Sequence, residues 1–224
     1  MNSKNVKVSD GSLHKSNLRL AFREKANQHL LHSPQRSAQQ TALAHRVKSL
    51  LTDLRATGIW GSFQPIGAEP DIRPIMRDLE RDAVISWAYP RVEGDSLTFY
   101  LVTDSTTMIA NRWGILEPDP LLSPRVEADA FQGLIIPGVA FDLHCQRLGR
   151  GRGFYDRTLA HFKLGKVKIG VAFETQISVE PLPTESFDVA MDWVVTESRV
   201  LQRAVTLGHA HDANDEIETG RKNL

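Results

Sequence analysis

The stretch that decides the fold is residues 134–159, which read LIIPGVAFDLHCQRLGRGRGFYDRTL. It opens on an apolar run, residues 134–136, which is typical of a buried strand, and the Pro-Gly pair that follows ends that strand. A polar loop, residues 142–146, then leads to a glycine-rich turn, and a helix is predicted over residues 154–162. A strand, a glycine-rich turn and a helix start in this order are typical of an anion-binding site.

The turn itself, residues 147–153, reads RLGRGRG, with glycines at alternate positions and arginines among them. Glycine lets backbone N–H groups close around an anion, and arginine binds phosphate oxygens in bidentate fashion. Residues 142–157 hold four arginines and two aspartates, although the whole chain has a formal net charge of zero. Because crowded arginines repel one another unless an anion is present, this composition favours a phosphate site.

Glycine spacing alone leaves the nature of the turn open, since a purely structural turn before a helix has the same pattern. The turn is not a P-loop, because no Gly-Lys-Ser/Thr follows at the required spacing. It is not a dinucleotide-binding fingerprint either, because the third glycine of that motif falls elsewhere. The neighbouring segments therefore have to decide which anion binds.

Composition excludes several classes of protein. A balance of 27 basic and 27 acidic residues argues against a general nucleic-acid or membrane-surface binder. The single cysteine, Cys145, excludes an internal disulfide and is suited to a reducing compartment, and nothing around it indicates a nucleophile. There is no apolar run of membrane-spanning length and no apolar signal sequence, so we expect a cytoplasmic protein. We also expect it to act as a monomer.

The pattern along the chain predicts one α/β domain, residues 15–203, between polar tails at 1–14 and 204–224. Strands alternate with helices, which predicts three layers: a mostly parallel sheet with helices on both faces, Rossmann-like but without a dinucleotide fingerprint. Helices are predicted over residues 15–31, from the Ser33-Pro34 start to about residue 56, and after a cap at Asp71. Strands are predicted over residues 59–63, 84–89, 97–102, 168–173 and 192–196.

Side chains that follow predicted strands are candidates for the site, because ligands of such folds bind beyond the carboxyl ends of the strands. Glu69, the glycine-rich turn and Asp188 all occupy such positions. Lys15 and Arg19 lie four residues apart on one helix face, which by itself is more often a solvated basic face. Trp113 lies in a predicted loop, where it either covers the core or forms the wall of a flat ligand's pocket.

Taken together, these segments resemble the 5-formyltetrahydrofolate cyclo-ligase family. The central match is PGVAFD at 137–142 followed by RLGRGRGFYDR at 147–157. Other matching segments follow in the family's order over residues 15–199: KxxLR at 15–19, QPIGAEPD at 64–71, WGILEP at 113–118, FETQ at 173–176, FD at 187–188 and DWVVTE at 192–197.

The resemblance implies an enzyme that uses ATP and Mg²⁺ to convert 5-formyltetrahydrofolate to 5,10-methenyltetrahydrofolate, with release of ADP and phosphate. Small molecules, and neither nucleic acid nor membrane, would be its partners. Phosphorylation of the formyl oxygen and ring closure by N10 need positioning and charge neutralisation more than a covalent nucleophile. No persuasive Ser/His/Asp or Cys/His set is present in the sequence, which agrees with that chemistry.

Roles carried over from the family are expectations for the matching positions. The expected catalytic residues are Arg150 and Tyr155, and the expected metal ligands are Asp156 and Asp188. The expected ATP-binding set is Lys15, Arg19, Arg147, Gly149, Arg150, Gly151, Arg152, Gly153, Phe154 and Tyr155. The expected folate-binding set is Gln64, Glu69, Trp113, Arg150 and Phe154.

Two positions depart from the family pattern. Phe154 replaces the commoner first tyrosine of the motif, which removes a hydroxyl donor and keeps a stacking face. Arg152 stands where many members have glycine or lysine. Two other hypotheses remain open here: a non-catalytic relative that binds a nucleotide, RNA or folate, and another enzyme of similar fold, such as a sugar-phosphate isomerase or a CoA transferase.

Overall fold

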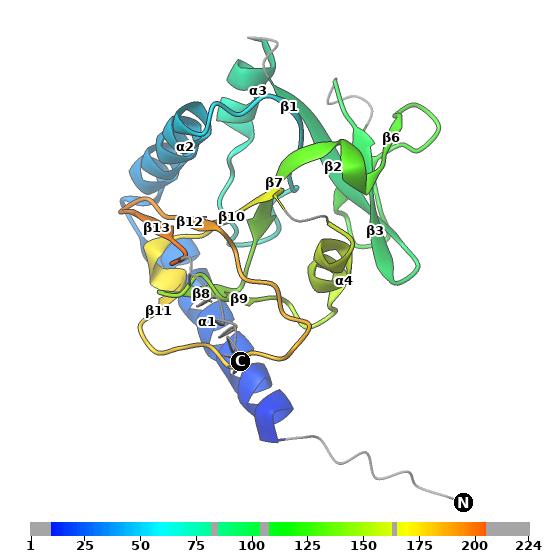
Figure 1. The fold of residues 1–224 in the computed structure, drawn as a ribbon. Coiled ribbons are helices and arrows are strands. Elements are labelled where there is room, and N and C mark those ends of the chain that lie inside the picture. The colour runs from blue at the N-terminus through cyan, green and yellow to red at the C-terminus, as the bar shows by residue number, and fades with distance from the viewer. Residues whose placement is uncertain (1–9, 82–84, 104–107, 163–164, 205–224) are drawn as a thin grey trace, which may run out of the picture.

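A computed structural model describes residues 10–81, 85–103, 108–162 and 165–204 (Figure 1). Of the tails predicted at the two ends, residues 1–9 and 205–224 lie outside this description. The helices are α1 (Asp10–His32), α2 (Arg36–Asp53), α3 (Arg73–Arg81) and α4 (Phe154–Ala160), with short 3-10 turns at Ala128–Ala130 and Glu174–Gln176. No helix among the described residues is long and apolar enough to cross a membrane.

One large sheet forms the centre of the molecule, with the strand order β13-β12-β10-β7-β1-β2-β3-β6. The five strands from β12 to β2 are parallel to their neighbours, whereas β13, β3 and β6 pair in antiparallel fashion at the two edges. Its strands are β1 (Gly58–Gly61), β2 (Ile85–Glu93), β3 (Ser96–Leu101), β6 (Arg125–Val126), β7 (Phe131–Pro137), β10 (Val167–Val171), β12 (Trp193–Val195) and β13 (Val200–Gln202). The predicted mostly parallel sheet is confirmed.

Two smaller sheets flank the central one. The first joins β11 (Ile177–Ser178), β8 (Ala140–Asp142) and β9 (Arg147–Leu148), and it leads directly into the glycine-rich turn. The second is a hairpin of β4 (Met108–Ala110) and β5 (Leu116–Pro118), whose connection carries Trp113. Both lie on the side of the large sheet where the parallel strands end, and there they build the walls of a cavity described below.

Helices cover both faces of the sheet, as predicted, and β7 is buried on both faces. Ile135 packs with α2 and α3, while Leu134 and Ile136 pack with Leu159 of α4 on the opposite face. Successive side chains of a strand point to opposite faces, so a strand covered on both sides reads as one continuous apolar run. This burial is why residues 134–136 predict the centre of the fold so clearly.

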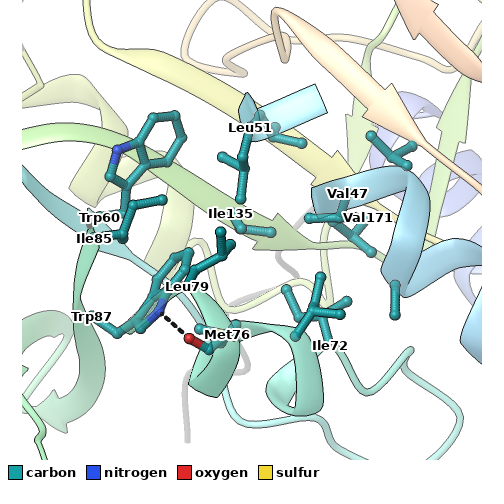
Figure 2. Close-up of a cluster of buried hydrophobic side chains, with 14 of the residues drawn as sticks. Val47, Leu51, Trp60, Ile72, Met76, Leu79, Ile85, Trp87, Ile135 and Val171 are labelled. Carbon is teal, nitrogen blue, oxygen red and sulfur yellow. Dashed lines mark hydrogen bonds between the residues drawn. The ribbon is translucent and has the colours of Figure 1, made fainter. Parts of the chain in front are cut away.

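The core beneath α2 and α3 contains two tryptophans from adjacent parallel strands (Figure 2). Trp60 of β1 and Trp87 of β2 are partners in the sheet register, and both are almost completely buried. The indole N–H of Trp87 donates to the backbone oxygen of Met76 in α3 at 3.0 Å. A buried indole needs such an acceptor, so this bond fixes α3 against the sheet as well as satisfying the tryptophan.

Several predicted boundaries were wrong. α1 begins at Asp10, five residues before the predicted start, and α2 begins at Arg36 instead of directly after Ser33. The hydroxyl of Ser33 does not cap the helix, because it donates to Oε1 of Gln39 at 3.1 Å. α2 ends at Asp53, beyond which Arg55 takes the left-handed conformation (φ 50°) that closes many helices.

Two strand features were not predicted. β2 continues past the expected end at residue 89 and through Pro90 to form a long antiparallel hairpin with β3. The last predicted strand covers 192–196, but a further strand, β13, follows it and pairs with β12 in antiparallel fashion. The end of β2 and the whole of β13 have no fully buried residue, so few positions mark them as strands in the sequence.

Candidate functional site

A cavity of about 350 Å³ lies beyond the C-terminal ends of β1 and β7. Gln64 and Glu69 reach it from the loop after β1, and Gly138 reaches it from the end of β7. The opposite wall is apolar and comes from the β2–β3 hairpin and the β4–β5 hairpin. This wall consists of Pro90, Val92, Leu97, Ile115 and Leu116.

Most of the residues predicted for the site meet in this cavity. The members that line it are Gln64, Glu69, Trp113, Arg147, Gly149, Arg150, Arg152, Gly153, Phe154, Tyr155 and Asp156. Four predicted residues do not line it: Lys15, Arg19, Gly151 and Asp188. The structure therefore brings Glu69 and the glycine-rich turn together, whereas Asp188 belongs to a separate contact with Lys15.

Arg150 connects the glycine-rich turn to the loop after β1. Its Nε and Nη2 atoms lie 3.0 and 2.7 Å from Oε1 of Glu69, and Nη2 also donates to the Ile66 oxygen at 3.0 Å. The other carboxylate oxygen of Glu69 accepts the Ile66 N–H at 2.8 Å. Burial raises the pKa of Glu69 even though the charge and hydrogen bonds of Arg150 oppose the shift.

Arg147 is a buried cation at the base of the turn, with a side chain only 4 % exposed. Its Nη2 atom lies 2.6 Å from Oδ1 of Asp156, while its Nε atom is buried without a partner among the described residues. An unpaired buried guanidinium N–H is costly, and it fits a site that receives an anion.

Tyr155 follows the turn as the second residue of α4. Burial, and then the negative charge of Glu69, raise the pKa of its phenol well above the usual range. The ring lies 5.4 Å from the guanidinium carbon of Arg147. At neutral pH Tyr155 is therefore a hydrogen-bond donor and not a base.

α1 contacts the turn from outside the cavity. Nζ of Lys15 lies 2.6 Å from Oδ2 of Asp188 and 3.0 Å from Oε2 of Glu185, so this buried lysine is paired with two carboxylates. Arg19 donates through Nε to the Gly149 oxygen at 2.9 Å. The two cations predicted from the helix face are therefore held by the protein, and are not spread over a solvated surface.

The two predicted metal ligands lie in different surroundings. Asp156 lines the cavity and is paired with Arg147, whereas Asp188 is paired with Lys15. Among the described residues there is no group of three or more His, Cys, Asp or Glu side chains placed to hold a metal ion. Any divalent cation here would need further oxygen atoms from a ligand.

Sequence reasoning missed the frame that holds Trp113. Glu117 is buried, and its Oε1 atom accepts from Nδ2 of Asn111 at 2.8 Å and from the Val92 N–H at 3.3 Å. Oδ1 of Asn111 accepts the N–H groups of Trp113 and Ile115 at 2.9 and 3.1 Å. The matched segment at 113–118 contains Glu117, but Trp113 is its only member among the predicted site residues.

Arg23 and Asp142 were also missed. Arg23 extends the four-residue spacing of Lys15 and Arg19 by one step, and it lines the cavity. Asp142 is fully buried and accepts three backbone N–H groups, from His144, Gln146 and Leu182, each at 2.9 Å. Asp142 therefore has a structural role: it shapes the loop that presents Arg147.

Comparison with known proteins gives the same family by three routes. The model of the 5-formyltetrahydrofolate cyclo-ligase family matches residues 12–197. The 5-formyltetrahydrofolate cyclo-ligase of Escherichia coli is 34 % identical over 142 residues, which cover 62 % of this chain and 77 % of that protein. The protein of the same name from Mycolicibacterium smegmatis is 29 % identical over 161 residues, covering 70 % and 82 % respectively.

Solved structures show the same relationship. The 5,10-methenyltetrahydrofolate synthetase of Aquifex aeolicus superposes with a TM-score of 0.72 at 30 % identity, covering 88 % of this chain and 98 % of that one. The synthetase from Mycoplasma pneumoniae, at 22 % identity and a TM-score of 0.66 over 82 % and 98 % of the chains, shares the fold. With the family model matched over most of the described domain, this chain belongs to the 5-formyltetrahydrofolate cyclo-ligase family.

Proposed function

We propose that this protein is an ATP-dependent ligase that converts 5-formyltetrahydrofolate to 5,10-methenyltetrahydrofolate and releases ADP and phosphate. The observation that carries the proposal is the composition of the cavity described above, in which an arginine-rich glycine turn faces an apolar wall with a tryptophan. The turn suits phosphate oxygens, and the apolar wall suits a flat aromatic ligand. The proposed reaction needs both kinds of ligand side by side.

For ATP, the supporting feature is unbalanced positive charge. Arg147, Arg150 and Arg152 line the cavity, with Glu69 and Asp156 as nearby carboxylates. The unpaired Nε–H of Arg147 would donate a hydrogen bond to a phosphate oxygen. Lys15 and Arg19 lie behind the turn, so their part in binding ATP requires Lys15 to exchange a carboxylate partner for phosphate.

For the folate, the supporting feature is the wall around Trp113. This residue is 46 % exposed, and the guanidinium carbons of Arg112 and Arg152 lie 4.0 and 5.4 Å from the centre of its ring. A half-exposed aromatic ring on a fixed loop can stack on a flat heterocycle. Gln64 and Glu69 supply the polar groups that would recognise its edge.

The proposed chemistry proceeds in two steps. The formyl oxygen attacks the γ-phosphorus of ATP, and the bond from that phosphorus to the bridging oxygen breaks to give ADP. N10 then attacks the activated formyl carbon, the carbon–oxygen bond breaks to release phosphate, and the N10 proton passes to solvent. Arg150 would stabilise the transferring phosphoryl group, and Tyr155, as a neutral phenol, would donate a hydrogen bond.

Mg²⁺ fits this site only together with a nucleotide. Asp156 and Asp188 are suitable oxygen ligands, but each is bound to a cationic side chain and they form no cluster of metal ligands. Mg²⁺ is commonly held by one or two carboxylates plus substrate phosphates and waters. When bound with ATP, it would neutralise charge on the phosphate oxygens.

The direct test is to incubate the purified protein with ATP, Mg²⁺ and 5-formyltetrahydrofolate, and to record methenyl-folate absorbance and ADP together. We expect both to rise in equal amounts. Folate binding in calorimetry without ADP release would favour a non-catalytic relative. Turnover of another substrate without ATP would favour an enzyme of a different class.

A further inference from the structure

Each glycine of the turn lies against an arginine guanidinium, and this packing accounts for the alternate spacing. A Cβ atom placed on Gly149 would lie 2.9 Å from Nη1 of Arg147, and one on Gly153 would lie 2.7 Å from Nη1 of Arg157. A Cβ on Gly151 would lie 3.4 Å from Nε of Arg19. The glycines therefore make room for arginines as well as for a ligand.

These and neighbouring arginines bind the carbonyl oxygens of the turn. Arg19 donates to the Gly149 oxygen at 2.9 Å, and Nη2 of Arg23 donates to the Arg150 oxygen at 3.1 Å. Nη2 of Arg157 donates to the Arg152 oxygen at 2.8 Å. In the described part of the chain, by contrast, the N–H groups of residues 150–153 have no acceptor. The turn thus keeps its donors available for an anion.

Arg157, which lies in α4, contacts the turn between β2 and β3 as well as the glycine-rich turn. Its Nε and Nη2 atoms lie 2.8 and 2.6 Å from the Asp95 oxygen, in the tight turn between β2 and β3. Arg157 does not line the cavity, although Gly153 beside it does. Its side chain therefore joins the hairpin to the glycine-rich turn without being placed to touch a ligand.

We propose that Arg157 is a positioning residue for the anion site, holding the Arg152 carbonyl away from the cavity so that the N–H groups of the turn face it. This inference rests on the proposed function, because the anion is taken to be the phosphate chain of ATP. Gly153, at φ +66°, is required in this arrangement for its conformation and for the space that Arg157 fills. Asp95 in the turn of the hairpin accepts from Arg157 and so fixes the position of its guanidinium.

The test compares Arg157→Ala and Arg157→Lys with Arg125→Ala, in which another exposed arginine, paired with Glu127 outside the cavity, is removed. Calorimetry with inorganic tripolyphosphate measures the anion site without catalysis, and steady-state kinetics give separate KM values for ATP and folate. For Arg157→Ala we expect the Kd for tripolyphosphate and the KM for ATP to rise about tenfold, the effect of losing a charge-assisted hydrogen bond. The KM for folate should stay within about twofold.

Arg157→Lys should recover part of the loss, since one ammonium group cannot serve two carbonyls with the geometry of a guanidinium. If Arg157→Ala binds tripolyphosphate as tightly as Arg125→Ala does, or if the wild type does not bind it, the inference is wrong. If Arg157→Ala weakens tripolyphosphate binding while the wild type releases no ADP, the positioning role stands and the proposed activity fails. Circular dichroism of each variant confirms that it is folded.

Discussion

Two irregular segments line the same cavity but are held in place in opposite ways. The glycine-rich turn is held by residues far away in the chain: Arg150 binds Glu69, 81 positions earlier, and Arg19 binds Gly149 across 130 positions. The Trp113 loop is held mainly from close by, through Asn111 and Glu117 at its two ends. Glu117 also pairs with Arg91 and accepts the Val92 N–H of β2, 25 positions earlier. The proposed phosphate side therefore depends on contacts across most of the domain, whereas the proposed folate side depends on two hairpins close together in the sequence.

Removing Arg150 should have the largest effect, because it breaks the long-range connection of the turn. We expect kcat for Arg150→Ala to fall roughly 100- to 1000-fold, the usual cost of losing one donor to a developing negative charge. Steady-state rates of methenyl-folate formation measure it, with Arg125→Ala as the control. A kcat within a few-fold of wild type would contradict the role given to Arg150.

Glu117→Ala should break the local frame of the other segment. It leaves the Asn111 amide and the Val92 N–H without their acceptor, so the free energy of unfolding should fall by about 1–3 kcal/mol. The KM for folate should rise about tenfold with the KM for ATP unchanged. The matched control is Glu127→Ala, an exposed carboxylate; equal changes in both KM values would contradict a local role.

Glu69 makes the contact between the glycine-rich turn and the loop after β1, the Arg150–Glu69 pair, sensitive to pH. Burial raises its pKa, so the folded protein binds this proton more tightly than the unfolded chain does. The stability from this group is therefore complete below the unfolded pKa, about 4.3, and is lost as pH rises through the folded value. In urea unfolding at several pH values, the free energy of unfolding of the wild type should decline with rising pH in this way. The decline should be smaller in Glu69→Gln. If the free energy of unfolding depends on pH in the same way in both proteins, Glu69 is not the cause of the decline.

Trp113→Phe should have the smallest effect, because it keeps an aromatic face on an intact loop. Loss of ring area should raise the KM for folate only about two- to threefold, within the range that aromatic contacts contribute. Trp113→Ala should raise it further. If both variants bind folate with wild-type affinity in calorimetry, the ring is not part of the folate wall.

The centre of the fold could be predicted because burial leaves a pattern in the sequence. The apolar run of β7 and the spaced apolar residues of α2 and α3 face the core directly, and all three elements are present. The edge strands β13, β4 and β5 could not be predicted in this way. They are short and half-exposed, and their pairing depends on neighbours that only the tertiary structure provides.

The candidate site was predictable where motif residues act through their own side chains, as Glu69 and Arg150 do. It was not predictable where residues act on a backbone brought near by folding. Arg157 binds the Asp95 oxygen, and Asp142 binds the Leu182 N–H, contacts that no spacing in the sequence indicates. The apolar wall from the β2–β3 hairpin was missed because β2 was predicted to end too early.

The contacts of α1 have a consequence for how the protein is made. Lys15 pairs with Asp188, 173 positions later, so during synthesis α1 waits for almost the whole domain before this partner exists. At about 5–20 residues per second, that interval is roughly 9–35 s. During this time the sheet can form around β7, and the Lys15 end of α1 is fixed late. Newly made chains should thus acquire a folded core before α1 is fixed against it.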